Sequence, residues 1–91
     1  GGYMAYWDFT HLCGLIQIKS LFPELTEKQF IVTFYWAIGT EIFDIAREQS
    51  CSVEAVKKTL QRSKGALGVE RLESVRSVFL CRIMADLWIR R

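Results

Sequence analysis

The sequence has little of what several classes of protein require. One proline and six glycines among 91 residues argue against a fold of many tight turns and favour long helices. A single histidine, His11, excludes most histidine-dependent catalysis, because serine–histidine and cysteine–histidine mechanisms would both have to use that imidazole. No apolar run reaches the ~18 residues of a membrane span, and the N-terminus lacks the basic and apolar segments of a signal peptide. We therefore expect a cytoplasmic protein that is not an enzyme.

Cysteines are also few and far apart. Cys13, Cys51 and Cys81 form neither a disulfide framework nor the closely spaced pairs of a zinc site. We expect three buried thiols in a reducing compartment, with no metal and no cofactor. Apolar side chains are plentiful: 51% of the residues are hydrophobic and 13% are aromatic, which suits one small folded domain and excludes a disordered tail.

Charge is small overall but unevenly distributed. The net charge is +2, yet residues 1–54 carry three basic and seven acidic groups, whereas residues 55–91 carry nine basic and three acidic groups. Four cations lie within eight residues of the basic half, with no acidic residue among them: Lys57, Lys58, Arg62 and Lys64. Such a block on one helix is an electrostatic footprint for phosphate, although a solvated helix face would have the same composition.

Caps and apolar spacing predict an all-α domain of four or five helices. We expect helices over residues 3–22, from Thr26 to a stop at Gly39, and over 40–49, 53–65 and 70–89. Thr26 and Gln29 form a capping box, which favours a helix although the β-branched and aromatic residues 30–36 have the propensity of a strand. That helix is apolar nearly all round and therefore must be central to the core.

Two of these helices, 40–49 and 53–65, form a predicted helix-turn-helix, because only the small residues Ser50-Cys51-Ser52 separate them. Ser52 caps the second helix, whose Val56 and Leu60 form an inward i, i+4 pair and leave the cations on the other faces. In such a motif the first helix braces the second, whose N-terminal side chains meet base edges in the major groove of DNA.

The last helix, 70–89, has more apolar surface than one small core can cover. Leu72, Val75 and Phe79 begin one stripe that continues to Ile83, and further apolar residues widen it. Contiguous exposed apolar surface usually marks an interface, so we predict a homodimer formed through this helix. The predicted dimer residues are Phe79, Ile83, Met84, Leu87 and Trp88.

A set of ordered motifs across residues 25–83 resembles the LuxR/FixJ/GerE-type DNA-binding domain. That family reads approximately L-T-x-R-E, A-x-G with E-I-A, I-S-x-x-T-V-K-x-H, L-G-V and R-x-E-A. The matching segments, in the same order, are Leu25-Thr26-Glu27-Lys28-Gln29, Ala37-Ile38-Gly39, Asp44-Ile45-Ala46, Cys51-Ser52-Val53-Glu54-Ala55-Val56-Lys57, Leu67-Gly68-Val69 and Arg71-Leu72-Glu73-Ser74. Three positions depart from the family pattern: Phe43 stands in place of a lysine, Ala55 in place of a threonine and Thr59 in place of a histidine.

The resemblance implies a LuxR-type helix-turn-helix domain over residues 23–91, preceded by an N-terminal helical extension over residues 1–22. It implies that Lys57 contacts a phosphate and that the last helix is a dimer contact. Base edges would be faced by Val53, Glu54, Lys58 and Gln61. The complete set of predicted DNA-binding residues is Ser52, Val53, Glu54, Lys57, Lys58, Gln61, Arg62 and Lys64.

We therefore predict sequence-specific binding of double-stranded DNA by a bacterial-type transcription regulator that forms a homodimer. RNA polymerase or another regulator is a further expected partner, whereas no membrane or small-molecule substrate is indicated. The alternative is a helix-turn-helix that binds protein, as an anti-activator or a polymerase-contacting module, with weak or no DNA binding. Phe43, which we interpret as an interface ring, favours that alternative together with Trp36, Trp88 and the acidic first half of the chain.

Overall fold

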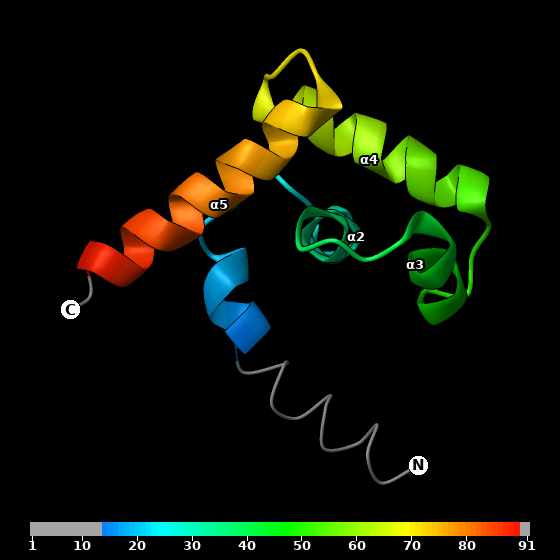
Figure 1. Cartoon of the computed structure of the whole chain (residues 1–91), viewed down its shortest axis with the longest axis horizontal. Coiled ribbons are helices and arrows are strands. Elements are labelled where there is room, and N and C mark those ends of the chain that lie inside the picture. The colour runs from blue at the N-terminus through cyan, green and yellow to red at the C-terminus, as the bar shows by residue number, and fades with distance from the viewer. Residues whose placement is uncertain (1–13, 90–91) are drawn as a thin grey trace, which may run out of the picture.

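The computed structural model describes residues 14–89, and within them the chain is a compact all-α globule of five helices without strands (Figure 1). Residues 14–19 form the first helix. The others are α2 (Glu27–Ala37), α3 (Ile42–Glu48), α4 (Val53–Leu67) and α5 (Leu72–Ile89). The helices predicted from the sequence are thus confirmed where they are described. The expectations placed on His11 and Cys13 lie outside the described residues.

Helix α2 forms despite its strand-like composition because its first turn is capped on both sides. The backbone N–H of Gln29 donates to the Thr26 hydroxyl at 3.2 Å, and the Thr26 N–H donates to the Gln29 side chain at 3.0 Å. Two of the free donors of the helix N-terminus are therefore satisfied, as the capping box predicts. Figure 1 shows α2 end-on at the centre of the molecule, where it contacts α3, α4 and α5, which confirms its central place.

Aromatic rings hold the core together between the N-terminal segment, α2 and α5. Phe22 stacks on Phe79 with ring centroids 4.0 Å apart, and Phe30 lies 6.0 Å from Phe79. All three rings are fully buried. The prediction that Phe79 lies at a dimer interface is wrong, because this ring packs inside its own domain and offers no surface to a partner.

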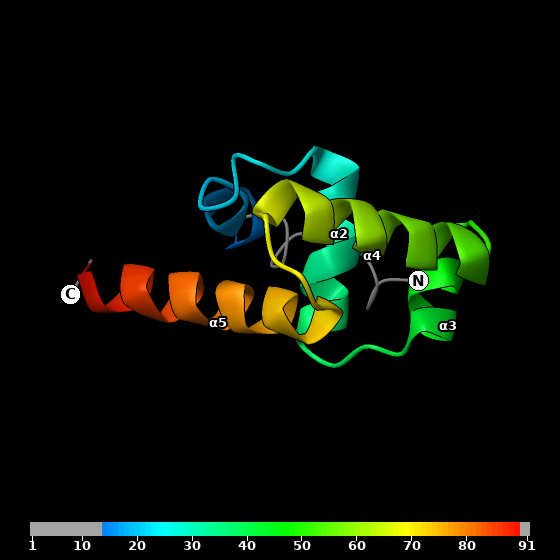
Figure 2. The same ribbon diagram turned by 90° about the horizontal axis from the view of Figure 1, so that it is seen from above.

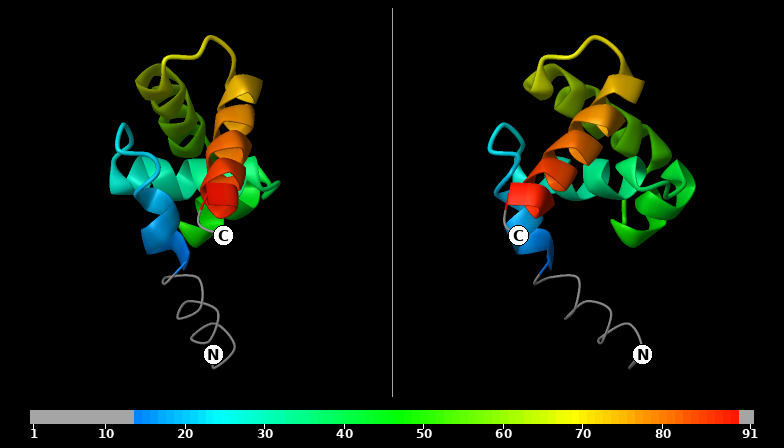
Figure 3. Two further views of the ribbon diagram at one scale, coloured as in Figure 1. Left: turned by 90° about the vertical axis from the view of Figure 1, so that its left-hand side faces the viewer. Right: turned by 60° about the vertical axis from the view of Figure 1, so that its left-hand side comes forward.

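Two arginines of α5 tie this helix to earlier parts of the chain. The guanidinium of Arg76 lies 4.1 Å from the centre of the Trp36 ring and donates to the carbonyl oxygens of Trp36 and Ala37 at 3.1 and 3.2 Å. It thereby places a cation at the C-terminus of α2, where the last turn has no basic residue of its own. Arg82 forms a two-pronged ion pair with Glu24 in the loop before α2. Figure 3 shows the C-terminal half of α5 near the helix over residues 14–19 that precedes this loop.

Residues 49–52 connect α3 to α4 in a tight turn. Ser50 takes a left-handed conformation with φ of 53°, and the N–H of Cys51 donates to the Ala46 carbonyl at 2.9 Å. The Ser52 hydroxyl then accepts from the N–H of Ala55 at 3.0 Å and begins α4. At the other end Gly68, with φ of 72°, ends α4, and Figure 2 shows the chain crossing from there to the start of α5.

The thiols are less buried than expected from the sequence. Cys51 is half-buried against the core, but Cys81 is exposed on α5, so the expectation of buried thiols is wrong for Cys81. It was wrong because the helical period puts Cys81 two residues beyond Phe79, on the side of α5 that faces away from the core. None of the helices in the described part of the chain is both long and apolar enough to cross a bilayer.

Candidate nucleic-acid interface

Helix α4 has one buried face and one exposed face. Its buried residues follow helical spacing: Val56, Thr59, Leu60 and Ser63. The inward pair of Val56 and Leu60 predicted from the sequence is confirmed, and both side chains lie in the core cluster. Residues Glu54, Lys58 and Gln61, spaced by four and three positions, lie on the opposite side of the helix and are exposed.

A buried hydrogen bond sets how α4 sits on α2. The hydroxyl of Thr33 donates to the hydroxyl of Ser63 at 2.6 Å, and the Ser63 hydroxyl in turn lies 3.5 Å from the Gln29 carbonyl oxygen, to which it donates. Both side chains are fully buried. This link was not predicted, because it joins residues 30 positions apart and neither side chain belongs to an apolar pattern. It fixes which residues of α4 face outward, since any rotation of α4 would leave both hydroxyls buried without partners.

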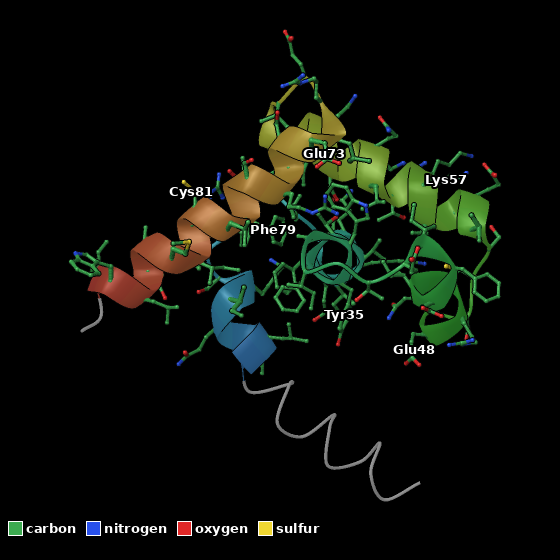
Figure 4. All side chains as sticks on the ribbon, in the orientation of Figure 1. Tyr35, Glu48, Lys57, Glu73, Phe79 and Cys81 are labelled. Carbon is green, nitrogen blue, oxygen red and sulfur yellow. The ribbon has the colours of Figure 1, made fainter. Side chains whose placement is uncertain are left out.

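Three of the predicted cations lie on the outer side of α4. Lys57, Lys58 and Arg62 are exposed, and Figure 4 shows Lys57 on the side of α4 that points away from α2. The Lys57 ammonium lies 4.0 Å from the Glu54 carboxylate, a loose and solvent-exposed pair that contributes little. Lys58 and Arg62 make no ion pair with any described residue.

Lys64 differs from the other three cations. Its side chain is half-buried, and its ammonium lies 3.4 Å from the Glu70 carbonyl oxygen, to which it donates. This contact is long and exposed to solvent, so Lys64 stays among the predicted DNA-binding residues, at the C-terminal end of α4.

The structure brings five of the eight predicted DNA-binding residues together at the N-terminal half of α4. Ser52, Glu54, Lys57, Lys58 and Gln61, together with Ala55, line an open depression on the surface. Val53 does not join them as a surface residue, because it is half-buried and packs against the core. Thr59, which stands where the family has a histidine, is buried, and its hydroxyl donates to the Ala55 carbonyl at 2.9 Å.

Helix α3, which precedes α4 in the chain, presents an exposed aromatic ring. Phe43 is 65% exposed, and the guanidinium of Arg47 lies 5.8 Å from its ring centre. Arg47 also donates to the Asp44 carboxylate at 3.0 Å. The exposed surface of α3 thus combines an apolar ring with one arginine whose charge is already partly neutralised.

The outer side of α5 is apolar, whereas the outer side of α4 is basic. Met84, Leu87 and Trp88, three of the five predicted dimer residues, are exposed, whereas Ile83 is half-buried against the core. Leu80, one of the apolar residues that widen the stripe of this helix in the sequence, is exposed as well. The exposed apolar residues of α5 therefore lie beside the stripe through Val75 and Phe79, which is buried.

Nothing in residues 14–89 gathers three or more histidine, cysteine or carboxylate side chains into a metal site. Comparison of the chain with protein-family models, with curated proteins and with solved structures finds no match.

Proposed function

We propose that the chain is a DNA-binding transcription regulator of bacterial type, in which α3 and α4 form a helix-turn-helix of the LuxR kind. Helix α4 enters the major groove of duplex DNA, and the protein binds as a dimer. The observation that carries this proposal is the outer face of α4: a braced, 15-residue helix with three exposed cations and one glutamine opposite its buried side.

The chemistry of that face suits a duplex better than a small anion. Helix α4 is about 22 Å long and the major groove is about 12 Å wide, so the groove admits the helix with its outer side chains toward the bases. Lys57, Lys58 and Arg62 would neutralise phosphates along the groove. Gln61 would form two hydrogen bonds with an adenine edge, and Glu54 would accept one from cytosine.

The connection between α3 and α4 supports the same proposal. Four residues, 49–52, join the helices, and the Thr33–Ser63 hydrogen bond holds α4 at one rotation. A recognition helix has to be held in this way, because a rotation of one residue would replace Gln61 by a different side chain at the base edges.

Salt-dependent DNA binding tests the proposal. We expect a labelled mixed-sequence duplex to bind at low salt, with a log–log slope of affinity against salt of about −3 per protomer from three phosphate contacts. Replacing Lys57 and Lys58 together by alanine should weaken binding more than tenfold and make the slope shallower by about 2. The matched control replaces Lys19 and Lys28 by alanine, which changes the net charge equally but outside α3 and α4.

Two results would contradict the proposal. The first is an absence of duplex binding even at low salt, with circular dichroism showing an intact helical fold. The second is an equal loss of binding in the Lys57/Lys58 variant and in the control variant, because that would assign binding to net charge rather than to α4.

A second candidate function is favoured by Phe43. An aromatic ring that is 65% exposed on α3 is typical of a protein-binding surface, and the neighbouring carboxylates Glu41, Asp44 and Glu48 disfavour contact with a phosphate backbone. We infer that a chain that fails to bind duplex DNA would instead be a protein-interaction module using α3. Replacing Phe43 by serine separates the two, because DNA binding through α4 should survive that change.

A further inference from the structure

Gly65 is a glycine inside a helix. It lies two residues before Leu67, the last residue of α4, and its φ is not in the left-handed region that favours glycine. Glycine loses more conformational freedom in a helix than any other residue, so it weakens a helix interior. Alanine or lysine would stabilise this turn, and a lysine near the C-terminus would also complement the helix dipole. A glycine at this position therefore needs a physical reason.

The fold of the described residues does not supply that reason. A Cβ atom added at Gly65 would have nothing within 4 Å apart from its chain neighbours and the backbone of its own helix. Gly65 is also exposed, so no other helix packs on it. Gly68, by contrast, is explained by its positive φ of 72°. The chain itself would thus tolerate a side chain at position 65, and the open space is available to a partner.

This open space adjoins the outward-facing side chains of α4. Gly65 lies four residues after Gln61 and seven after Lys58, so it shares the outer face of the helix with them. Helical side chains lean toward the N-terminus, so a side chain at position 65 would cover the turn that contains Gln61 and Arg62. Arg62 is exposed and makes no ion pair with any described residue. Glycine therefore leaves its guanidinium uncovered.

Distances along α4 place this space at the rim of the major groove. With the N-terminal half of the helix at the base edges, the rise from Glu54 to Gln61 is about 10 Å, close to the groove width of about 12 Å. Gly65 lies about 6 Å further along the axis and therefore beyond the base edges. The sugar–phosphate backbone runs along that rim, and contacts to it fix how a protein lies on the duplex.

We propose that a DNA backbone strand crosses α4 at Gly65, where the lack of a side chain lets a phosphate reach the Arg62 guanidinium. Arg62 binds the phosphate, and Gly65 is a positioning residue, because a larger side chain there would hold the phosphate away. The inference rests on the proposed function and deepens it, since it names a contact beyond the N-terminal half of α4 and the residue that makes room for it.

The stability of the fold and the affinity for DNA should change in opposite directions. Gly65→Ala should raise the melting temperature by a few degrees, because alanine favours the helix. The same variant should bind a labelled mixed-sequence duplex at least about fivefold more weakly at low salt, and the bulkier Gly65→Leu more weakly still. Gly14→Ala is the matched control, because Gly14 is an exposed helical glycine with the same open space outside α3 and α4, and this variant should bind like the wild type.

A double-mutant cycle tests the phosphate contact itself. Arg62→Ala in the wild type should weaken binding and make the log–log salt slope shallower by about 1. In the Gly65→Leu background the same replacement should have little further effect, because the phosphate no longer reaches the guanidinium. Lys57→Ala should weaken binding equally in both backgrounds, since Lys57 lies in the N-terminal half of α4.

Three results would overturn the inference and leave the proposed function standing. The first is equal duplex affinity of the wild type and Gly65→Leu. The second is a lower melting temperature of Gly65→Ala, because the fold itself would then require glycine. The third is additive losses for Arg62→Ala and Gly65→Leu. A wild type that is folded but binds no duplex at low salt overturns the proposed function, and this inference with it.

Discussion

Replacing Glu24 by glutamine should lower the free energy of unfolding at neutral pH. In acid the same replacement should have almost no effect on it. Arg82 donates to the two carboxylate oxygens of Glu24 at 2.9 and 2.8 Å and also donates to the Leu21 carbonyl at 2.8 Å. The same guanidinium lies 5.1 Å from the centre of the Phe22 ring. One ion pair therefore holds the loop before α2 against α5, directly above the stacked pair of Phe22 and Phe79.

The expected magnitude follows from the pKa of Glu24. Hydrogen bonds from Arg82, helped by a backbone hydrogen bond, lower this pKa from 4.5 to about 2. A shift of that size corresponds to at most about 3.4 kcal/mol, at about 1.36 kcal/mol per pH unit. Because both side chains are about one-third exposed, solvent screening reduces the contribution, and we expect about 1–1.5 kcal/mol.

The sign of the pH dependence follows from the direction of this shift. The pKa of Glu24 is lower in the folded than in the unfolded state, so the stabilisation is complete above pH 4.5 and is lost as the pH falls toward 2. Urea unfolding of the wild type and of Glu24→Gln, followed by circular dichroism, should thus show a difference at pH 7 that narrows steadily between pH 5 and pH 2.

A matched control separates this ion pair from a general effect of charge. Glu48 is exposed on α3 and makes no ion pair with the described residues, so Glu48→Gln should unfold like the wild type at each pH. The reasoning is refuted if Glu24→Gln and Glu48→Gln have the same stability at pH 7. It is also refuted if the deficit of Glu24→Gln is as large at pH 3 as at pH 7.

Two further predictions concern the elements that position α4. Ser63→Ala should destabilise the fold by about 1–3 kcal/mol, because it leaves the buried Thr33 hydroxyl without an acceptor. Adding Thr33→Val should recover part of that loss. A double-mutant cycle that shows no coupling between the two positions would contradict the hydrogen bond. Ser50→Gly should raise the melting temperature by a few degrees, because the left-handed conformation at φ of 53° is strained for serine and not for glycine. A lower melting temperature would show that the turn is not strained.

Local signals in the sequence were sufficient where a few neighbouring residues decide the structure. The Thr26–Gln29 capping box predicted a helix against the strand propensity of the residues after it, and α2 is a helix with both capping hydrogen bonds formed. Ser52 was predicted to cap α4 and does so. Caps can be recognised from the sequence because the donor and the acceptor lie within four residues of each other, so no knowledge of the fold is needed.

The candidate site could be predicted from the sequence only in part. Val56 and Leu60 indicated the inward face of α4, and helical spacing alone then placed Lys58 and Gln61 outside. The sequence did not show that the side chain of Lys64 turns back to the Glu70 carbonyl, because that contact depends on the path of the turn after α4. Composition therefore identified the basic helix but not the contacts that its cations make within the chain.

What the sequence by itself determined is the order and type of the helices and the periodic faces of α4 and α5. Only the tertiary structure decided how those faces are turned. Phe79 lies in the core, stacked on Phe22, whereas Leu80 lies on the surface. Arg76 completes the end of α2 from about forty residues away. The physical reason is that helical periodicity records which residues share a face, whereas the element that covers the face is chosen by packing between distant segments.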